Sequence, residues 1–336
     1  MLPDALRTEL AAVPDLRLLT QPDDLERFSR DAYDYSPVLQ QRLAQCRAEL
    51  VVRPETVDAV VRVAAGCRQH GVPLTLRGSG TGNYGQSVPL ESGVVMLMSQ
   101  LRAVRSIDQS SGVVTVECGC LMKDLNRELA RVGRQLRLMP STWRSATIGG
   151  FIAGGSGGIG SVRWGFLRDP GHLLGLEVVT MEQQPRVLQL EAGDAEALNH
   201  AYGTNGIITA LRLATATSVD WQELVVDCPD WRTAVDLARR CTSAAIDLHL
   251  CTVLEAAVVE LLPNWDLPQR RSDRLLLLVA PDAVSTVQRL ASAVGAEMTH
   301  LGAEADRHGS GLRELSWNHT TLHLRQRDPG WTYLQM

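Results

Sequence analysis

The chain has 336 residues, of which 45% are hydrophobic and 21% charged, a composition that is ordinary for a globular protein with a large core. Its formal net charge of -5 gives no electrostatic reason to expect a nucleic-acid partner. Lys123 is the only lysine, which excludes a P-loop NTPase because the lysine of that loop contacts the phosphates.

The cysteines and the first residues indicate a cellular compartment. The 7 cysteines include no Cys-x-x-Cys pair, so we expect free thiols in a reducing compartment rather than a zinc or iron–sulfur framework. The opening MLPDALRTEL lacks the basic and apolar regions of a signal peptide. No apolar run approaches the ~20 residues that span a bilayer. The sequence therefore predicts a cytoplasmic protein with no integral membrane segment.

The first half of the chain predicts a mixture of helices and short strands. Residues 1–44 form a helical lead-in, in which a helix with an acidic start stops at Pro37. Residues 57–70 carry apolar side chains at helical spacing, and Gly71 stands where a C-capping glycine is expected. Apolar runs at 72–76, 93–98 and 112–119 predict strands, and 121–133 predicts an amphipathic helix.

In the second half of the chain, the order of the predicted elements and the glycine content change near Ser218. Before it, residues 173–181 and 185–190 predict paired strands, 194–203 a short helix, and 206–217 a strand with one solvated face. After it, strands and helices alternate with almost no glycine, which predicts a separate α/β layer. We therefore expect a central domain of residues 45–218 and a C-terminal domain of residues 219–336.

Two glycine-rich stretches, residues 77–86 and 140–165, are the main functional signals. The first contains the pattern G-x-G-x-x-G from Gly80 to Gly85, which in a nicotinamide-binding fold opens a helix. Here Pro89 and Gly93 follow, and the next segment predicts a strand, so the context disfavours a Rossmann domain. Two interpretations remain: tight turns, or two ribbons of backbone N–H groups that bind an elongated ligand with a pyrophosphate centre.

The stretch RGSGTGNYGQ, residues 77–86, resembles the pyrophosphate loop of FAD-linked oxidoreductases of the vanillyl-alcohol oxidase and para-cresol methylhydroxylase type, especially the glycolate oxidase and D-lactate dehydrogenase branch. Four further segments match in the same order: PETVDAVVRVAAGCRQHGVPL, PSTWRSATIGGFIAGGSGG, RWGFLRDPGHLLGLEVV and GTNGIITALRL. The resemblance covers residues 45–216. It implies an α+β fold with a two-lobed, PCMH-type FAD-binding domain at 45–218 and a small, shortened α/β cap domain at 219–336.

The resemblance also implies a set of FAD-binding residues, carried over by position. The first loop would hold the pyrophosphate, and the start of the second stretch would approach the flavin. The rest of the second stretch would line the other side of the diphosphate and the ribityl chain, and the last three positions would meet the adenine end. The set is Arg77, Gly78, Ser79, Gly80, Thr81, Gly82, Asn83, Pro140, Ser141, Thr142, Thr147, Ile148, Gly149, Gly150, Gly154, Gly157, Gly160, Gly206, Ile207 and Ile208. Thr81 and Trp143 stand where relatives with tethered FAD have histidine and cysteine, which implies non-covalent FAD.

In the resembled branch, a small 2-hydroxy acid gives its α-hydride to the flavin, which requires a cation for the carboxylate and a base for the hydroxyl proton. His319 and His323 stand four residues apart, in a segment whose threonines and leucines favour a strand. They are either a surface or half-buried pair, or His319 is the catalytic base, with Arg325 or Arg163 for the carboxylate. No third ligand accompanies them, so we expect no metal.

The function implied by the resemblance is oxidation of a small 2-hydroxy acid such as glycolate or D-lactate, with electrons passed to an acceptor other than nicotinamide. Two departures from the branch keep an alternative open. Tyr202 stands where glutamate is usual, and the chain ends before the histidine- and asparagine-rich stretch of family dehydrogenases. The alternative is a non-catalytic or partner-dependent FAD-binding subunit of a glycolate-dehydrogenase-like complex, with a second redox subunit as partner.

Overall fold

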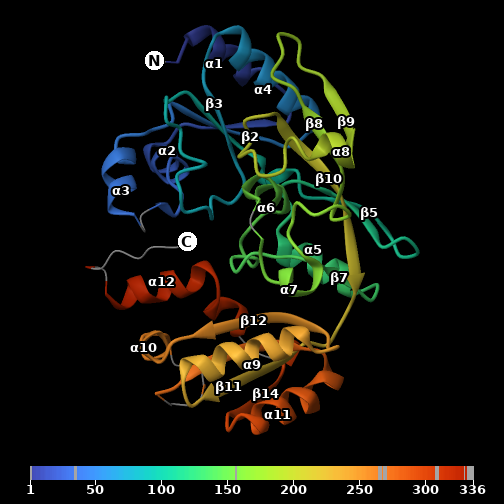
Figure 1. Ribbon diagram of the computed structural model, residues 1–336. Helices are drawn as coiled ribbons and strands as arrows, with labels where there is room; N and C mark the ends of the chain where they lie inside the picture. Colours follow the sequence, from blue (N-terminus) through green and yellow to red (C-terminus); the bar gives the residue numbers. More distant parts are fainter. Residues whose placement is uncertain are drawn as a thin grey trace. The chain divides into compact units, whose positions relative to one another are not determined.

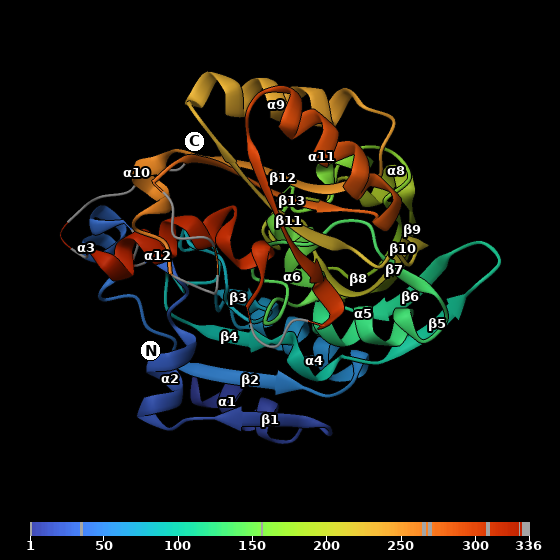
Figure 2. The ribbon, with the colours of Figure 1, turned by 90° about the horizontal axis from the view of Figure 1, so that it is seen from below.

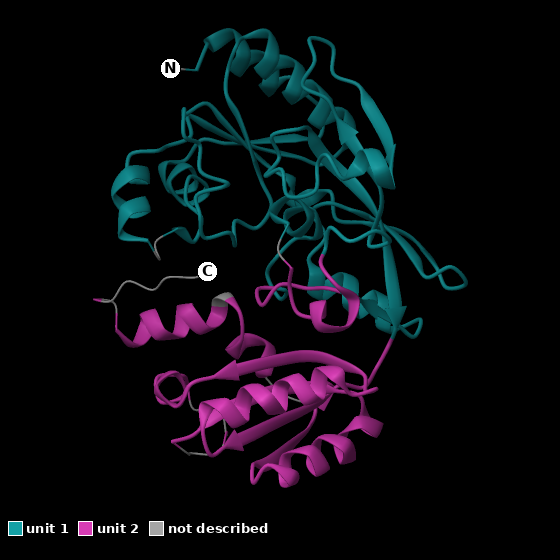
Figure 3. Cartoon of the chain, viewed as in Figure 1, with its two compact units in different colours: residues 1–137, 143–156, 167–217 teal, residues 138–142, 157–166, 218–336 magenta. Residues whose placement is uncertain are grey.

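The computed structural model describes residues 2–33, 36–155, 157–263, 267, 271–306, 310–328 and 330. The chain divides into two compact units (Figures 1 and 3). Unit 1 comprises residues 1–137, 143–156 and 167–217, and unit 2 comprises residues 138–142, 157–166 and 218–336. Both units combine helices with sheets, which confirms the expected α+β class. Two short segments of the second glycine-rich stretch, 138–142 and 157–166, are thus part of unit 2.

Unit 1 begins with a four-stranded sheet of order β1-β2-β4-β3. β2, β4 and β3 pair in parallel, and β1 joins the edge antiparallel to β2. The predicted helix between β2 and β3 is confirmed, and Gly71 adopts a left-handed φ of 64° just beyond its end. The bounds are α1 (Asp4–Ala11), β1 (Leu16–Leu19), β2 (Leu50–Pro54), α4 (Val57–Gln69), β3 (Leu74–Arg77), β4 (Val94–Leu97) and the 3-10 turn η2 (Met98–Gln100).

After α1 and β1, the lead-in continues with two short helices, α2 (Pro22–Phe28) and α3 (Pro37–Leu43), rather than one helix that stops at Pro37. Pro37 begins α3, because proline at the first helical position forfeits no intrahelical hydrogen bond. The Ser36 side chain caps this helix by accepting a hydrogen bond from the Leu39 N–H at 3.3 Å. Tyr33, Leu43 and Val88 form a small buried core, so the lead-in packs against the segment that follows the first glycine loop.

The second sheet of unit 1 has the order β5-β6-β10-β8-β9, with β7 also paired to β10. The predicted β8–β9 hairpin is confirmed. β10 was expected to have one solvated face, but only Arg212 and Thr217 are exposed, so both faces of the strand are largely covered. The predicted helix at 194–203 was wrong beyond its first turn. The bounds are β5 (Val104–Asp108), β6 (Val113–Glu117), α5 (Met122–Ala130), β7 (Arg134–Leu136), α6 (Ile148–Gly154), β8 (Leu173–Val179), β9 (Val187–Glu191), α8 (Ala192–Ala195) and β10 (Ile207–Thr217).

Unit 2 is built on an antiparallel sheet of order β12-β13-β11-β14. α9 and α11 pack side by side on one face (Figure 2), where Leu224, Leu237, Leu277 and Val287 are fully buried. The bounds are α7 (Ser161–Trp164), β11 (Gln222–Cys228), α9 (Trp231–Ser243), β12 (Leu248–Leu254), α10 (Ala256–Val259), β13 (Asp273–Val279), η3 (Pro281–Ala283), α11 (Val284–Ala293), β14 (Glu297–Ala303), η4 (Glu304–Asp306), η5 (Leu312–Leu315) and α12 (Asn318–Arg327).

The segment that contains His319 forms the helix α12, so the expected strand was wrong. Two side chains tie this helix to the turn before it. The Thr320 hydroxyl donates to the Leu315 carbonyl oxygen at 2.8 Å, and His323 Nε2 lies 2.9 Å from the Glu314 carbonyl oxygen. Such tertiary anchoring overrides the weak strand preference of threonine. In the part of the chain that the structure describes, no helix has the length and apolar character needed to cross a membrane.

Candidate FAD site

The first glycine-rich loop follows β3 directly and exposes backbone donors. Gly80 and Gly85 have φ angles of 70° and 80°, which side chains other than glycine rarely tolerate. Among the described residues, none accepts a hydrogen bond from the backbone N–H groups of Ser79 through Asn83. A run of such N–H groups in a turn forms an anion-binding concavity. The loop therefore has the donor set that a diphosphate requires.

Arg77, the last residue of β3, folds its side chain against this loop. The residue is only 7% exposed, and a Cβ on Gly80 would lie 2.1 Å from Arg77 Nη2. Nη1 donates to Ser87 Oγ at 3.1 Å, where the loop returns toward β4. Burial lowers the pKa of Arg77, and the nearby Asp31 carboxylate opposes that shift. Arg77 thus adds positive charge to the loop and connects its two ends.

The second stretch meets the first within unit 1. A Cβ on Gly78 would lie 2.3 Å from Thr147 Oγ1 and 3.7 Å from Gly150 Cα, so only glycine permits this approach. Thr147 caps α6 by accepting the Gly150 N–H at 3.3 Å. The structure therefore brings together the residues predicted around Gly78 and those predicted around Thr147.

The donors at the start of α6 are already bonded to protein groups. The Ile148 N–H donates to the Cys120 carbonyl oxygen at 2.9 Å, and the Gly149 N–H donates to the Cys118 carbonyl oxygen at 2.8 Å. A Cβ on Gly149 would lie 2.5 Å from Cys118 Cβ, so this glycine permits close packing. The N–H groups of Ile148 and Gly149 are thus anchors for the stretch, and the first loop supplies the unbonded donors. With that division of roles, the residues present fit an FAD diphosphate.

Gly206, Ile207 and Ile208 lie at the start of β10. Ile207 and Ile208 pair with Val179 and Val178 of β8, and both side chains are buried. Gly206 has a φ of 147°, and a Cβ there would lie 2.7 Å from Val178 Cγ1. The packing of β8 alone explains the glycine at this position. Gly154 has no heavy atom within 4 Å of the position that its Cβ would take.

The remaining predicted FAD residues, Pro140, Ser141, Thr142, Gly157 and Gly160, belong to unit 2. Gly160 begins α7 with a φ of 103°, and its N–H donates to the His249 carbonyl oxygen at 2.9 Å. These contacts fix the segments against β12 inside unit 2. The assignment of Pro140, Ser141 and Thr142 to the flavin end, and of Gly157 and Gly160 to the diphosphate and ribityl chain, stays a prediction.

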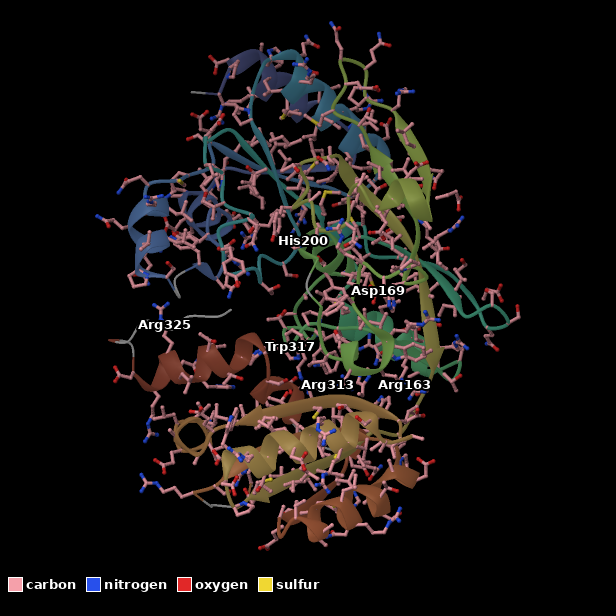
Figure 4. The ribbon with its side chains drawn as sticks, viewed as in Figure 1. Arg163, Asp169, His200, Arg313, Trp317 and Arg325 are labelled. Carbon is pink, nitrogen blue, oxygen red and sulfur yellow. The ribbon has the colours of Figure 1, made fainter. Side chains whose placement is uncertain are left out.

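Arg163, the predicted partner of a substrate carboxylate, lies on α7 beside an acidic residue of its own chain. Its Nη1 is 2.9 Å from Asp247 Oδ2, and its guanidinium lies over the Trp164 ring, 5.0 Å from the centroid. Arg163, Arg313 and Trp317 come from three different elements of unit 2 (Figure 4). Arg163 can therefore bind a carboxylate only by sharing its guanidinium with Asp247.

His319, the predicted base, lies in the first turn of α12, with its ring centroid 6.1 Å from that of His323. Burial lowers the pKa of His319 and so does His323, whereas Glu314 opposes the shift. The ring is therefore neutral at pH 7, the state in which it accepts a proton. Nδ1 is buried without a described hydrogen-bond partner. The described residues contain no cluster of three His, Cys, Asp or Glu side chains suited to a metal ion.

The sequence analysis missed a buried polar group in unit 2. His249 is 1% exposed and stacks on Trp221 with a centroid distance of 4.7 Å. Neither ring nitrogen has a described partner, and burial followed by the charges of Arg313 and Arg163 holds its pKa well below the ordinary value. Nothing in the run IDLHLCT distinguishes this histidine from one on a solvated strand face, because Trp221, Arg163 and Arg313 lie outside that run.

Comparison with protein families and solved structures agrees with this site. A family model described as "FAD binding domain" matches residues 48–184. Glycolate oxidase subunit GlcD of Bacillus subtilis is 33% identical over 148 residues, which are 44% of this chain and 30% of that protein. The mitochondrial D-2-hydroxyglutarate dehydrogenase of Danio rerio is 29% identical over 163 residues, 48% of this chain and 29% of that protein.

A solved structure of alkyldihydroxyacetonephosphate synthase matches with a TM-score of 0.75, over 97% of this chain and 64% of that chain. Its sequence identity is 18%, so this likeness bears on the fold alone. The matched regions span about 30% of the length of these two curated relatives.

Proposed function

We propose that the chain is an FAD-dependent oxidoreductase of the vanillyl-alcohol oxidase and para-cresol methylhydroxylase type, since a family model described as "FAD binding domain" matches residues 48–184. Its substrate is a small 2-hydroxy acid, and its FAD is bound non-covalently. The observation that supports this proposal most is the contact of the two glycine-rich stretches at Gly78 and Thr147, beside five unbonded N–H groups. The substrate class follows the names of the relatives, a glycolate oxidase subunit and a D-2-hydroxyglutarate dehydrogenase.

In the proposed site, Ser79 through Asn83 bind the diphosphate through backbone N–H groups, and Arg77 adds a buried positive charge beside them. Gly78 keeps the loop close to α6. Bound FAD supplies hydride acceptance, which is chemistry that no side chain provides. The remaining requirements are a base for the substrate hydroxyl and a cation for its carboxylate.

We assign the base to His319. Its pKa is lowered, so the neutral ring is ready to accept the hydroxyl proton at Nε2, since Nδ1 is the nitrogen that is buried. His323 holds the neighbouring turn by its bond to the Glu314 carbonyl oxygen. We assign the binding of the substrate carboxylate to Arg163, whose guanidinium also pairs with Asp247.

Non-covalent attachment follows from the side chains near the loops. Thr81 offers no imidazole for a bond to the flavin. Burial raises the pKa of Cys118 to about 12 and that of Cys120 to about 11, so neither thiol is a ready nucleophile. We expect acid precipitation to release all the flavin into the supernatant. Flavin that stays with the precipitated chain would contradict this part of the proposal.

The reaction is tested by mixing the flavin-loaded protein anaerobically with a panel of D-2-hydroxy acids and following the flavin absorbance band. At least one acid should bleach the band, and His319→Gln should slow the bleaching by about 100-fold, the usual contribution of a general base. His70→Gln is the matched control, because His70 contacts Glu9 on the surface of unit 1. If His319→Gln keeps the wild-type bleaching rate, His319 is not the catalytic base. No bleaching with any acid would contradict the substrate class.

A second candidate function is that of an FAD-binding subunit that requires a partner chain. The printed name of the Bacillus subtilis relative, a subunit of glycolate oxidase, favours it. Purification from its native cells under mild conditions decides between the two. A stable complex with a second redox chain, together with no turnover by the isolated protein, supports the subunit. Turnover by the isolated protein supports the first proposal.

A further inference from the structure

The N-terminal lead-in contacts the first glycine loop, although the matched FAD binding domain begins only at residue 48. The Ala32 N–H donates to the Gly82 carbonyl oxygen at 2.8 Å. Asp31 Oδ2 accepts the Ser87 N–H at 3.4 Å, across 56 positions of sequence. Two consecutive residues of the lead-in are therefore bonded to the loop region: Ala32 to Gly82 in the middle of the loop, and Asp31 to Ser87 just after it.

Asp31 is itself held in place. Its Oδ1 accepts the Tyr33 N–H at 2.9 Å, so its two carboxylate oxygens accept from different segments of the chain. Burial raises the pKa of Asp31, while the bonds from Ser87 and Tyr33 and the charge of Arg77 oppose that shift. A carboxylate with this set of donors fixes the distance between the lead-in and the loop.

Arg77 extends the same network to the start of the loop. Its Nη1 bonds to Ser87 Oγ at 3.1 Å, and its guanidinium lies over the Phe28 ring, 5.9 Å from the centroid. Phe28 ends α2, so the aromatic contact also comes from the lead-in. The beginning, middle and end of the loop thus all contact the segment that runs from Phe28 to Tyr33.

The Ala32 bond has a direct consequence for the donors of the loop. In a trans peptide the C=O and the following N–H point in opposite directions. Because the Gly82 carbonyl points at Ala32, the Asn83 N–H points away from the lead-in. The bond therefore sets the direction of one of the five unbonded N–H groups.

We propose that Asp31 and Ala32 are positioning residues for the FAD diphosphate, which hold the 79–83 loop in its binding conformation before the cofactor arrives. This inference rests on the proposed assignment of that loop to the diphosphate. A loop that is already ordered loses less conformational freedom when it binds, so the anchors raise affinity without touching the cofactor. The alternative is a purely electrostatic effect of Asp31, whose negative charge repels a diphosphate and whose removal would tighten binding.

The experiment removes FAD from the full-length protein and measures its return by quenching of flavin fluorescence. We expect Asp31→Ala and Asp31→Asn to raise the Kd for FAD by about tenfold, because neither side chain accepts two N–H groups with two oxygens. Asp23→Ala is the matched control, an exposed acidic residue at the start of α2, and should bind FAD as the wild type does. The thermal midpoint of FAD-free Asp31→Asn should stay close to that of Asp23→Ala.

Hydrogen exchange of the FAD-free protein gives a second readout. In Asp31→Ala and in Asp31→Asn, amides of residues 78–88 should exchange faster, whereas those of the β8–β9 hairpin should not change. If Asp31→Ala does not fold, Asp31→Asn and Ser87→Ala carry the test, since Ser87→Ala removes only the acceptor of Arg77 Nη1. Ser87→Ala should raise the Kd about threefold, in line with one neutral hydrogen bond.

Gly80→Ala separates the loop assignment from the positioning role, because it distorts the loop and displaces the Arg77 guanidinium but removes no atom of Asp31 or Ala32. If Gly80→Ala weakens FAD binding while the Asp31 variants bind normally or more tightly, the positioning role is wrong and the diphosphate site stands. If neither change weakens binding, the loop does not hold the diphosphate, and both proposals are wrong. Unchanged exchange at residues 78–88 in Asp31→Asn would also overturn the positioning role.

Discussion

The two glycine-rich stretches have similar compositions and different hydrogen bonding. In the first, the N–H groups of Ser79 through Asn83 have no described acceptor, and Gly80 takes a left-handed φ. In the second, the N–H groups of Ile148 and Gly149 bond to the carbonyl oxygens of Cys120 and Cys118. The first stretch thus has donors left for the diphosphate that we propose it binds, whereas these donors of the second stretch are bonded within the protein.

This difference shows that glycine has two separate uses in one site. In the first loop it permits a backbone conformation that presents donors. At Gly78 it leaves room for the Thr147 hydroxyl, and at Gly149 it permits two backbones to approach more closely than any side chain allows. Substitutions of single glycines can therefore distinguish the two uses, because one should affect FAD affinity and the other the free energy of unfolding.

Gly149→Ala should have the largest effect on stability. Its Cβ would lie 2.5 Å from Cys118 Cβ and 2.8 Å from the Cys118 carbonyl oxygen, atoms that move only if the backbone moves. We expect a loss of about 3 kcal/mol in the free energy of unfolding, the upper range for overpacking. Denaturant unfolding of the FAD-free protein measures it. A loss below about 1 kcal/mol would show that the 118–120 segment gives way and that Gly149 is not a packing requirement.

Gly80→Ala should act mainly on the cofactor. The new Cβ would strain the backbone at a φ of 70° and displace the Arg77 guanidinium, which lies 2.1 Å from the Cβ position. We expect the Kd for FAD to rise about tenfold, which corresponds to roughly 1.4 kcal/mol. Fluorescence titration of the FAD-free protein measures it. An unchanged Kd, with unfolding affected as strongly as in Gly149→Ala, would mean that the two stretches do not differ in the way we describe.

The sequence predicted the elements and the cofactor from local pattern and from the ordered resemblance. Apolar residues at a period of 3.6, followed by Gly71, located α4. The residue pattern of the first glycine-rich loop led to FAD. It did not predict which glycines bind and which pack, because that depends on Cys118 and Cys120, which are remote in sequence from the first loop. Asp31 was missed for the same reason, since its bond to Ser87 spans 56 positions.

The error at α12 has a related cause. Threonine and leucine preferences favour a strand near His319, but propensity is a weak prior where side chains bond to a preceding turn. For β10, alternation indicated a solvated face, but both faces of the strand are largely buried, which depends on segments outside the strand. Local pattern thus predicted where the backbone is ordered, and only tertiary contacts decided its neighbours.

Thr147→Ala tests how α6 anchors the second stretch. The substitution removes the Oγ1 atom that accepts a hydrogen bond from the Gly150 N–H. The same atom lies 2.3 Å from the position that a Cβ on Gly78 would take. We expect a loss of about 1 kcal/mol in the free energy of unfolding, the usual value of an N-cap. Thr147→Ser keeps the hydroxyl and should restore most of it. If Thr147→Ser is as unstable as Thr147→Ala, the lost methyl group rather than the cap is responsible.

Gly154→Ala should have the smallest effect and the opposite sign. Gly154 is the last residue of α6, and its Cβ position has no heavy atom within 4 Å. Alanine is the better helix former, so the free energy of unfolding should rise by about 0.5 kcal/mol. The FAD titration makes this substitution informative, because Gly154 was predicted to line the cofactor. If alanine raises stability and leaves the Kd unchanged, Gly154 is neither a packing glycine nor a cofactor-binding one. If it raises the Kd as much as Gly80→Ala does, the cofactor occupies the space beside the end of α6, and the second stretch binds FAD as well as anchoring the first.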